Sequence, residues 1–291
     1  MIVLAPGGLG NQLFALAAAL HISEKRRITV HVLSDNKELV AKVLEVKKNL
    51  KNPTKVRVNY SRKFNLWTNK TSSRMLILSS KVPRVDSYMI RKFRTMSHSW
   101  EFPFDLLDIS AKKPWILRGF FQDIKLVQEL SESNRVFLAR LFDIELAQEY
   151  PGKILYPKSI GVHIRRGDYK DIPSYGILAI PYFQQLISQS SFNQLPTYVA
   201  SDDSNLLAIN RFTSRDTILD PKIKSPLTTM MILARVDIFL MSNSTFSFWI
   251  GWIVCLRGGR VYMPNPWFKH VEVPEDFLFM ESFIRTNAQF E

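Results

Sequence analysis

Residues 161–169 read Gly-Val-His-Ile-Arg-Arg-Gly-Asp-Tyr, a short apolar run that leads into two adjacent arginines and an acid. The run predicts a buried strand at Ile160–Ile164 that ends at Arg165. Arginine presents a rigid, permanently charged fork of donors that suits phosphate oxygens, and side chains at the carboxyl end of a parallel strand face the ligand crevice of an open α/β sheet. The stretch therefore predicts an anion site at Arg165 and Arg166, with Asp168 holding one guanidinium. A charged turn that closes a strand is the alternative.

Strands and helices alternate after this stretch and also at the start of the chain, which predicts parallel sheets covered on both faces. Turn signals cluster at residues 150–153 and predict a boundary between a domain of residues 1–152 and one of residues 153–291. Residues 50–113 are basic and aromatic, with weak periodicity. The expected strands are Ile2–Ala5, Ile28–Leu33, Trp115–Phe121, Ile160–Ile164, Thr197–Ala200, Thr217–Leu219, Val236–Met241 and Arg260–Met263, and the expected helices are Asn11–Arg26, Val127–Phe142, Pro181–Ser190, Pro226–Ala234 and Phe246–Leu256.

The composition is that of a folded protein with a basic surface. Apolar residues make up 46% of the 291 residues, charged residues make up 22%, and the formal net charge is +13. Such a surface attracts nucleotide diphosphates, acidic lipids or nucleic acid. Nucleic acid is not favoured as a partner, because the chain has no zinc-ligand spacing and no RNA-binding signature. Cys255 is the single cysteine, so the chain forms no internal disulfide, which fits a reducing compartment.

Residues 238–256 carry no charge and are about as long as a membrane-spanning helix needs to be. The polar residues Ser242-Asn243-Ser244-Thr245 interrupt this stretch and predict instead a buried strand followed by a buried helix. The first seven residues have neither the basic start nor the long apolar run of a signal peptide. We therefore expect a cytoplasmic protein.

Three further motifs accompany the arginine motif in order along the chain. Residues 7–14 read Gly-Gly-Leu-Gly-Asn-Gln-Leu-Phe, residues 201–203 read Ser-Asp-Asp, and residues 242–249 read Ser-Asn-Ser-Thr-Phe-Ser-Phe-Trp. With them the chain resembles the bacterial α-1,2-fucosyltransferases of glycosyltransferase family 11. The His-x-Arg-Arg-Gly-Asp element is shared with α-1,6-fucosyltransferases, whereas the glycine-asparagine-glutamine and Asn-Ser-Thr-Phe-Ser elements indicate the α-1,2 group. Smaller similarities lie at residues 119–122 and 264–268.

The resemblance implies a GT-B-like α/β fold, with two Rossmann-like domains facing a central cleft. The N-terminal domain would be the acceptor side, and the C-terminal domain would bind GDP-fucose. The implied reaction is inverting transfer of L-fucose from GDP-β-L-fucose to the 2-hydroxyl of a terminal galactose in a surface glycan such as O-antigen. The implied acceptor is lipid-linked, which would bring the enzyme to the anionic cytoplasmic face of the inner membrane. No metal and no cofactor are expected.

By the same resemblance, Arg165 and Arg166 would bind the donor and act in catalysis, with Asp168 as the third catalytic residue of the motif. Asp202 and Asp203 would accept hydrogen bonds from the guanosine part of the donor, while a helix N-cap is the alternative. They are consecutive acids rather than the Asp-x-Asp that is typical of metal-dependent transferases.

His163 is expected on the same strand face as Arg165, either beside the donor or as an ordinary core histidine. Leu13 stands where a dinucleotide-binding fingerprint would have its third glycine, which makes an NAD site the weaker explanation of the glycine loop. Residues 243–246 stand at the start of the helix expected at Phe246–Leu256, where ordinary capping is the alternative to phosphate binding. The remaining implied substrate-binding residues are Gly8, Gly10, Asn11 and Gln12 after the first strand, and Asn243, Ser244, Thr245 and Phe246 at that helix start.

Two departures from the family pattern leave the donor open. Residues 226–230 lack an acid that many members carry near Thr229, and Phe248 replaces the first of two paired tryptophans. An enzyme of the same fold with another linkage or GDP-sugar is therefore one alternative. A non-enzymatic basic protein that binds nucleotide or nucleic acid is the other. The sequence assigns no catalytic base.

Overall fold

The computed structural model describes residues 1–50, 54–61, 95–97, 116–142, 158–188, 191–203, 205–206, 212, 216–219, 224–274 and 277–291. The chain forms two compact units, Met1–Leu141 and Phe142–Glu291. Each unit contains a parallel sheet with helices, so the predicted α/β class with two Rossmann-like units is confirmed. The predicted boundary at residues 150–153 lies outside the described residues, and the cleft between the domains stays a prediction.

The described residues of unit 1 form a parallel sheet of five strands in the order β3-β2-β1-β5-β4. The strand β1 lies between β2 and β5, so the chain reverses direction across the sheet at β1. The carboxyl ends of β1 and β5 therefore meet at one switch point, where the glycine loop and residues 119–122 follow the two strands. The strands are β1 (Ile2–Leu4), β2 (Val30–Ser34), β3 (Val56–Tyr60), β4 (Thr95–Ser97) and β5 (Ile116–Arg118).

The helices of unit 1 match the predicted helices only in part. Helix α1 (Leu9–Arg26) is almost fully buried and follows the glycine loop as expected. The prediction of a single helix at Val127–Phe142 is wrong. Two short helices occupy that region, α7 (Ile124–Gln128) and α8 (Glu132–Arg140). The break arises because Ser131 caps α8 by accepting a hydrogen bond from a backbone amide of its first turn. Helix α2 (Lys37–Lys48) was not predicted.

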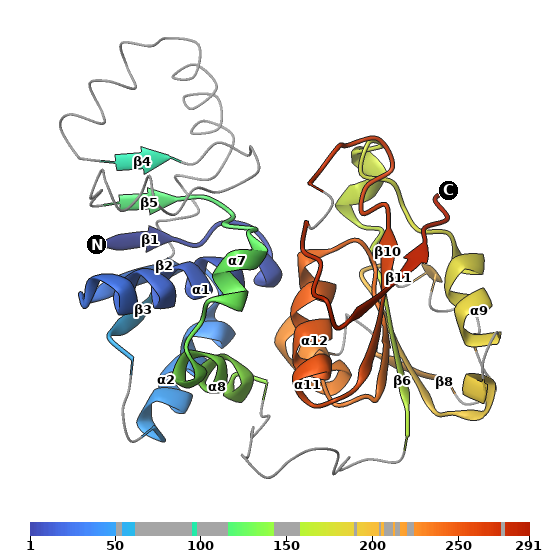
Figure 1. The fold of residues 1–291 in the computed structure, drawn as a ribbon, viewed down its shortest axis with the longest axis horizontal. Helices are drawn as coiled ribbons and strands as arrows, with labels where there is room; N and C mark the ends of the chain where they lie inside the picture. Colours follow the sequence, from blue (N-terminus) through green and yellow to red (C-terminus); the bar gives the residue numbers. More distant parts are fainter. Residues whose placement is uncertain are drawn as a thin grey trace. The chain divides into compact units, whose positions relative to one another are not determined.

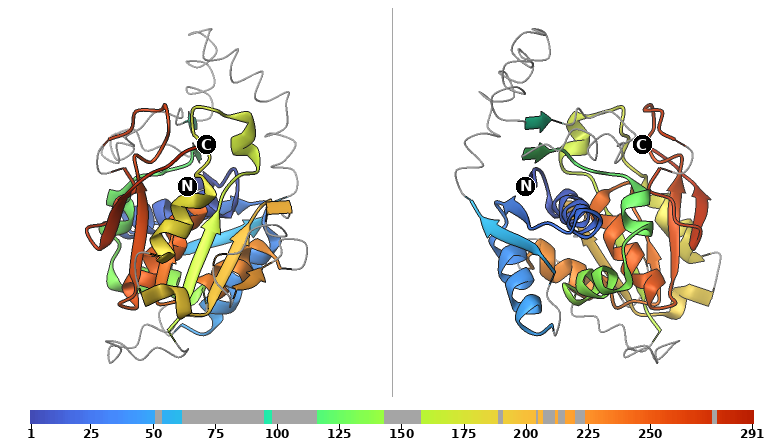
Figure 2. Two further views of the ribbon diagram at one scale, coloured as in Figure 1. Left: turned by 90° about the vertical axis from the view of Figure 1, so that its right-hand side faces the viewer. Right: turned by 60° about the vertical axis from the view of Figure 1, so that its left-hand side comes forward.

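In the described part of unit 2, six strands form a parallel sheet in the order β11-β10-β9-β6-β7-β8. Helices α11 and α12 lie on one face of this sheet and α9 lies on the other (Figure 1). The left view of Figure 2 shows the strands running from dark red β11 at one edge toward β7 and β8 at the other. The strands are β6 (Ile160–Ile164), β7 (Thr197–Ser201), β8 (Asp216–Leu219), β9 (Ile238–Leu240), β10 (Arg260–Asn265) and β11 (Phe283–Asn287), and the helices are α9 (Ile180–Ser188), α11 (Pro226–Leu233) and α12 (Thr245–Leu256).

The uncharged segment 238–256 lies in the interior of unit 2, as predicted. Strand β9 is buried along its whole length, and α12 buries Trp249 and Trp252 completely or almost completely. In the parts of the chain that the structure describes, no helix combines the length and the apolar character that crossing a bilayer requires. Burial of these two large aromatic rings anchors α12 and thereby fixes the position of its N-terminus at the carboxyl edge of the sheet.

Candidate functional site

The carboxyl edge of the unit 2 sheet has a switch point between β6 and β9. From β6 the chain continues to β7 and β8 on one side, and then to β9, β10 and β11 on the other. This is the strand order of a Rossmann fold, in which ligands bind where the order reverses. Arg165 follows β6, Ser242 and Asn243 follow β9 after one residue, and Asp202 and Asp203 follow β7. The fold thus brings three of the four predicted motifs to one edge.

Arg165 lies between two carboxylates. Its Nη2 is 2.6 Å from Oδ1 of Asp168, and its Nη1 is 2.7 Å from Oδ2 of Asp202. The guanidinium also lies over the Tyr169 ring, 5.6 Å from its centroid. Asp168 thus holds one arginine, as the sequence predicts, and Asp202 holds the same arginine from the next strand.

Asp202 also fixes the backbone of the arginine loop, which we define as residues 165–171. Its Oδ1 accepts hydrogen bonds from the backbone amides of Arg166, at 2.8 Å, and Gly167, at 3.0 Å. A Cβ at Gly167 would collide with this carboxylate, so the loop approaches Asp202 as closely as glycine alone permits. One carboxylate therefore sets both the path of the loop and the direction of Arg165.

Arg166 is paired with two other acids. Its Nε is 3.5 Å from Oδ2 of Asp203, and its Nη1 and Nη2 contact the two carboxylate oxygens of Glu291, the second pair at 3.0 Å. Asp203 is bound from a second side by Lys170, at 2.8 Å, and that hydrogen bond is the main cause of a lowered pKa of its carboxyl. Its Oδ1 accepts from the amide of Asn205, as the capping alternative requires.

His163 is a buried member of the same site. Its Nδ1 lies 3.1 Å from Oγ of Ser242 and 2.6 Å from Oγ of Ser247, and its ring lies beside Phe246 with centroids 4.7 Å apart. Burial lowers the pKa of the ring to about 3, against a smaller upward effect of Asp202. The imidazole is therefore neutral at physiological pH, and it joins the start of α12 to β6.

The lowered pKa of His163 predicts acid sensitivity of the fold. The unfolded chain binds a proton near the ordinary pKa of 6.5, whereas the folded chain resists it until about pH 3. Stability from this group is thus present above pH 6.5 and lost as the pH falls, by up to about 1.4 kcal/mol per pH unit. We expect His163→Gln to show a shallower loss of unfolding free energy between about pH 7 and about pH 5 in denaturant titrations. Equal slopes in the two proteins would contradict this expectation.

Asn243 and Tyr169 connect the two loops that border the switch point. The hydroxyl of Tyr169 donates to the backbone oxygen of Asn243 at 2.8 Å, and burial raises the pKa of that hydroxyl. The side-chain amide of Asn243 donates in return to the backbone oxygens of Tyr175 and Gly176, both at 3.1 Å. Asn243 is fully buried.

The start of α12 combines capping with accessible groups. The hydroxyl of Ser244 accepts a hydrogen bond from the amide of Phe246 at 3.2 Å, which is ordinary N-capping. Ser244 is buried, whereas Thr245 and Phe246 are half-buried. The capping alternative is thus present in the structure, and binding of phosphate by these residues stays a prediction.

The glycine loop of unit 1 surrounds a buried glutamine. The side-chain amide of Gln12 donates to the backbone oxygen of Gly7 and to Asp35, and its oxygen accepts from Ser34. Asn11 accepts a hydrogen bond from Gln122, at 2.9 Å, which joins the loop after β1 to the segment after β5. Gly10 is buried at the start of α1, and Gly8 is exposed as its N-cap. Gln12 therefore ties together the carboxyl ends of β1 and β2.

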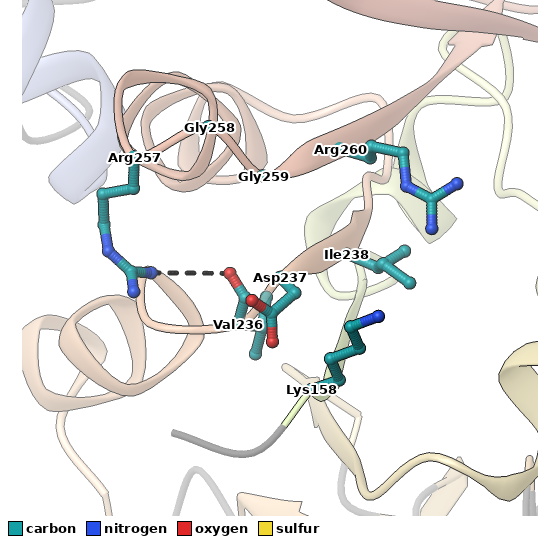
Figure 3. A pocket seen from close by; sticks show the side chains of 8 residues that line it. All are labelled: Lys158, Val236, Asp237, Ile238, Arg257, Gly258, Gly259 and Arg260. Atoms are coloured by element: carbon teal, nitrogen blue, oxygen red, sulfur yellow. Dashed lines mark hydrogen bonds between the residues drawn. The ribbon is translucent and has the colours of Figure 1, made fainter. Parts of the chain in front are cut away.

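A cavity of about 170 Å³ lies at the opposite, amino edge of the unit 2 sheet and contains none of the predicted residues. Arg257 is one of the residues that line it; its guanidinium donates to the backbone oxygen of Val236 (Figure 3) and to that of Ala234 at 2.9 Å. This arginine closes the end of α11. Within the described ranges, no three His, Cys, Asp or Glu side chains are grouped as metal ligands, and metal independence stays a prediction.

The side chains that pair with or pack on Arg165 and Arg166, together with Lys170, form one group that we call the cluster. Three of its members, Tyr169, Lys170 and Glu291, were not predicted from the sequence. Tyr169 is the last residue of the quoted stretch and Lys170 follows it, but polar residues are expected in any such turn and neither received a role. Glu291 is 125 residues away from Arg166 along the chain, and no spacing rule connects the two. Only the fold brings Glu291 to Arg166, because residue 291 follows β11 at the edge of the sheet.

The fold and this site define a doubly wound α/β protein that presents two arginines at its switch point. Residues 1–270 match the model of glycosyl transferase family 11, so the chain belongs to this family and the protein is a glycosyltransferase. The family predicted from the four motifs is thereby confirmed.

Two curated relatives and one solved structure show what the chain is similar to. The O-antigen biosynthesis glycosyltransferase WbnK of Escherichia coli is 25% identical over 90% of this chain and 93% of its own. An α-1,2-colitosyltransferase of Escherichia coli is 27% identical over 53% of this chain and 57% of its own. The crystal structure of the fucosyltransferase NodZ from Bradyrhizobium matches with a TM-score of 0.42 and 12% sequence identity. The match covers 86% of this chain and 91% of the NodZ chain.

Proposed function

We propose that this glycosyltransferase transfers L-fucose from GDP-β-L-fucose to the 2-hydroxyl of a terminal galactose, with inversion and without a metal ion. The observation that carries the proposal is the pair of arginines held at the switch point of unit 2, in a chain that belongs to glycosyl transferase family 11. An α-1,2-colitosyltransferase among the relatives supports the same linkage.

The arginines would act on the leaving group. As the bond from the anomeric carbon to the diphosphate breaks, negative charge grows on the diphosphate oxygens. The acceptor oxygen forms the new bond from the opposite face, and its hydroxyl proton is released to solvent. Fixed cationic donors stabilise such charge without reorganising during the reaction. Arg165 is fixed by Asp168 and Asp202, so its direction is set before the substrate arrives.

Metal independence gives a direct prediction. Because the guanidinium groups supply the positive charge that a metal ion would otherwise supply, we expect EDTA to leave the rate of transfer within about twofold of its value in buffer. The measurement is the initial rate with and without EDTA, after dialysis of the protein against chelator. A complete loss of activity that Mn²⁺ restores would overturn the metal-free mechanism.

Binding of GDP tests the donor half of the proposal. A ligand at 100 times its dissociation constant stabilises its folded receptor by about 2.7 kcal/mol, which a thermal unfolding curve resolves. We expect protection by GDP and weaker protection by ADP, UDP and CDP. Equal protection by all four, or by none, would contradict a guanosine-specific donor site.

Transfer of colitose is the second candidate function, because one of the relatives carries that activity in its name. The two departures from the family pattern leave the identity of the donor open. Thr229 is buried in α11, and Phe248 is fully buried against Trp249 and Phe283. Mass spectrometry of the product distinguishes a deoxyhexose from a dideoxyhexose.

The acceptor we propose is a lipid-linked bacterial surface glycan such as O-antigen, at the cytoplasmic face of the inner membrane. The support is WbnK, a relative whose name places it in O-antigen biosynthesis. A net charge of +13 would draw the protein to anionic lipid. Sedimentation with vesicles that contain anionic lipid, and not with neutral vesicles, is the matching test.

A further inference from the structure

The segment 288–291 places a carboxylate on Arg166. The amide of Ala288 donates to the backbone oxygen of Asn265 at 3.0 Å, and the amide of Glu291 donates to Ile177 at 2.9 Å. Between them the segment forms an antiparallel bridge in which Phe290 faces Leu178. The segment is thus held by backbone hydrogen bonds beside the chain that leaves the arginine loop.

Phe290 packs closely against the rest of unit 2, which fixes the position of the segment 288–291. Gly176 has a φ of +73°, and a Cβ there would lie 2.6 Å from Cδ1 of Phe290. Phe290 packs against the main core of unit 2. Only glycine combines this backbone conformation with so close an approach, so the sequence at residue 176 accommodates the segment that carries Glu291.

Glu291 occupies the fork of Arg166 in the way that a phosphate would. Both carboxylate oxygens contact the two terminal nitrogens of the guanidinium, one pair at 3.0 Å. Bidentate binding of this kind is the usual geometry of arginine with carboxylate and with phosphate alike. A donor diphosphate that uses the same fork must therefore displace the carboxylate.

Asp202 and Asp203 are held by additional partners, whereas the side-chain carboxylate of Glu291 is not, although Lys269 donates to the backbone oxygen of Glu291. Asp202 accepts two backbone hydrogen bonds besides its pair with Arg165. Asp203 is bound by Lys170 and by the amide of Asn205. Among the described residues, the carboxylate of Glu291 contacts Arg166 alone, and its side chain is 41% exposed. It is accordingly the acid of Arg166 that leaves at the lowest cost.

The charge of the cluster favours the same exchange. Among the described residues, the three cations Arg165, Arg166 and Lys170 are joined by ion pairs to four carboxylates, and a fourth cation, Lys269, donates to the backbone oxygen of Glu291. An incoming diphosphate meets no excess of positive charge while all four carboxylates are in place. Movement of the Glu291 side chain into solvent removes one negative charge at the point where the diphosphate binds.

We propose that Glu291 is a resident counter-ion of Arg166 that competes with the donor diphosphate and so sets the affinity for the donor. The inference rests on the proposed function, in which Arg166 binds the diphosphate. Glu291 thus affects how tightly the donor binds in the ground state. It does not act as a base, and Arg166 does not need it for support.

The test is the affinity of Glu291→Gln for inorganic pyrophosphate and for GDP, measured by calorimetry. Because glutamine keeps the size of the side chain and removes the competing charge, we expect both ligands to bind about three- to tenfold more tightly than to the parent protein. Glu281→Gln, which neutralises an exposed glutamate of the same unit, is the matched control and should leave both affinities unchanged. Thermal unfolding without ligand checks that each variant folds, and Glu291→Ala repeats the test with the side chain removed.

A second arm isolates the contact with Arg166. In a protein that carries Arg166→Ala, the additional change Glu291→Gln should leave pyrophosphate affinity unaltered, since the fork for which both anions compete is gone. In the transfer assay, Glu291→Gln should lower KM for the donor by the same factor and leave kcat unchanged. Unchanged or weaker pyrophosphate binding, including no binding by either protein, or a large fall in kcat, would overturn the proposal.

These outcomes separate the inference from the proposed function. Tighter pyrophosphate binding by Glu291→Gln, without any transfer of fucose, supports the counter-ion and contradicts the donor assignment. Transfer of fucose by the parent protein, with no gain in affinity in the variant, supports the donor assignment and contradicts the counter-ion role of Glu291.

Discussion

Replacing Arg166 by alanine is expected to lower kcat by about 100- to 1,000-fold while the protein stays folded, because a fixed charged donor to the leaving diphosphate is removed. The carboxylate of Asp203 holds Arg166 at the switch point, and the arginine side chain is only 16% exposed. Lysine in its place retains the charge and loses the fork, so Arg166→Lys should also be strongly impaired.

The measurement is initial rates of transfer at saturating donor, with thermal unfolding of each variant alongside. Arg260→Ala is the matched control, since Arg260 begins β10 at the amino edge of the same sheet and stacks on Phe192. Near-normal turnover of Arg166→Ala would contradict the assignment of this arginine to the diphosphate.

The second large effect is expected from Gly167→Ala. The new methyl group would collide with the carboxylate of Asp202, which holds the amides of Arg166 and Gly167 and the guanidinium of Arg165. Displacing a catalytic group by about 1 Å commonly costs about 100-fold in rate, and we expect a loss of that order. Strand β6 lies below the loop and stays packed, so the unfolding temperature should change little.

A mutant cycle with Asp202→Ala checks the cause. Asp202→Ala removes the same three contacts, so the double variant should be no less active than Asp202→Ala alone. Additive losses in the double variant would show that Gly167 acts by another route than through Asp202. Full activity of Gly167→Ala would contradict the role of the loop in setting the arginines.

The local part of the fold was predictable from the sequence. Strand β6 and the arginine loop follow from an apolar run that ends in charge, and the buried β9–α12 segment follows from polar residues inside an uncharged stretch. In both cases residues close together in the chain decide the structure. The alternation of strands and helices then implied parallel sheets with their carboxyl ends at one edge.

Features that depend on distant contacts were not predictable in the same way. One local feature was also missed: Ser131 caps α8 and so separates it from α7 within the region expected to form one helix. Gln12 stood out in the sequence as part of a motif, and the structure shows that Gly7, Ser34 and Asp35 take up its polar atoms. Glu291 reaches Arg166 only through the position of β11, which the sequence pattern left undefined.

The measurement that tests the central claim most directly is mass spectrometry of the purified protein incubated with GDP-fucose, a panel of β-galactosides and EDTA. We expect a product heavier by one deoxyhexose, with NMR placing the new bond at the 2-hydroxyl of galactose. We also expect Arg166→Ala to form no more than a trace of this product. Absence of transfer to every galactoside, together with absence of protection by GDP, would contradict the account.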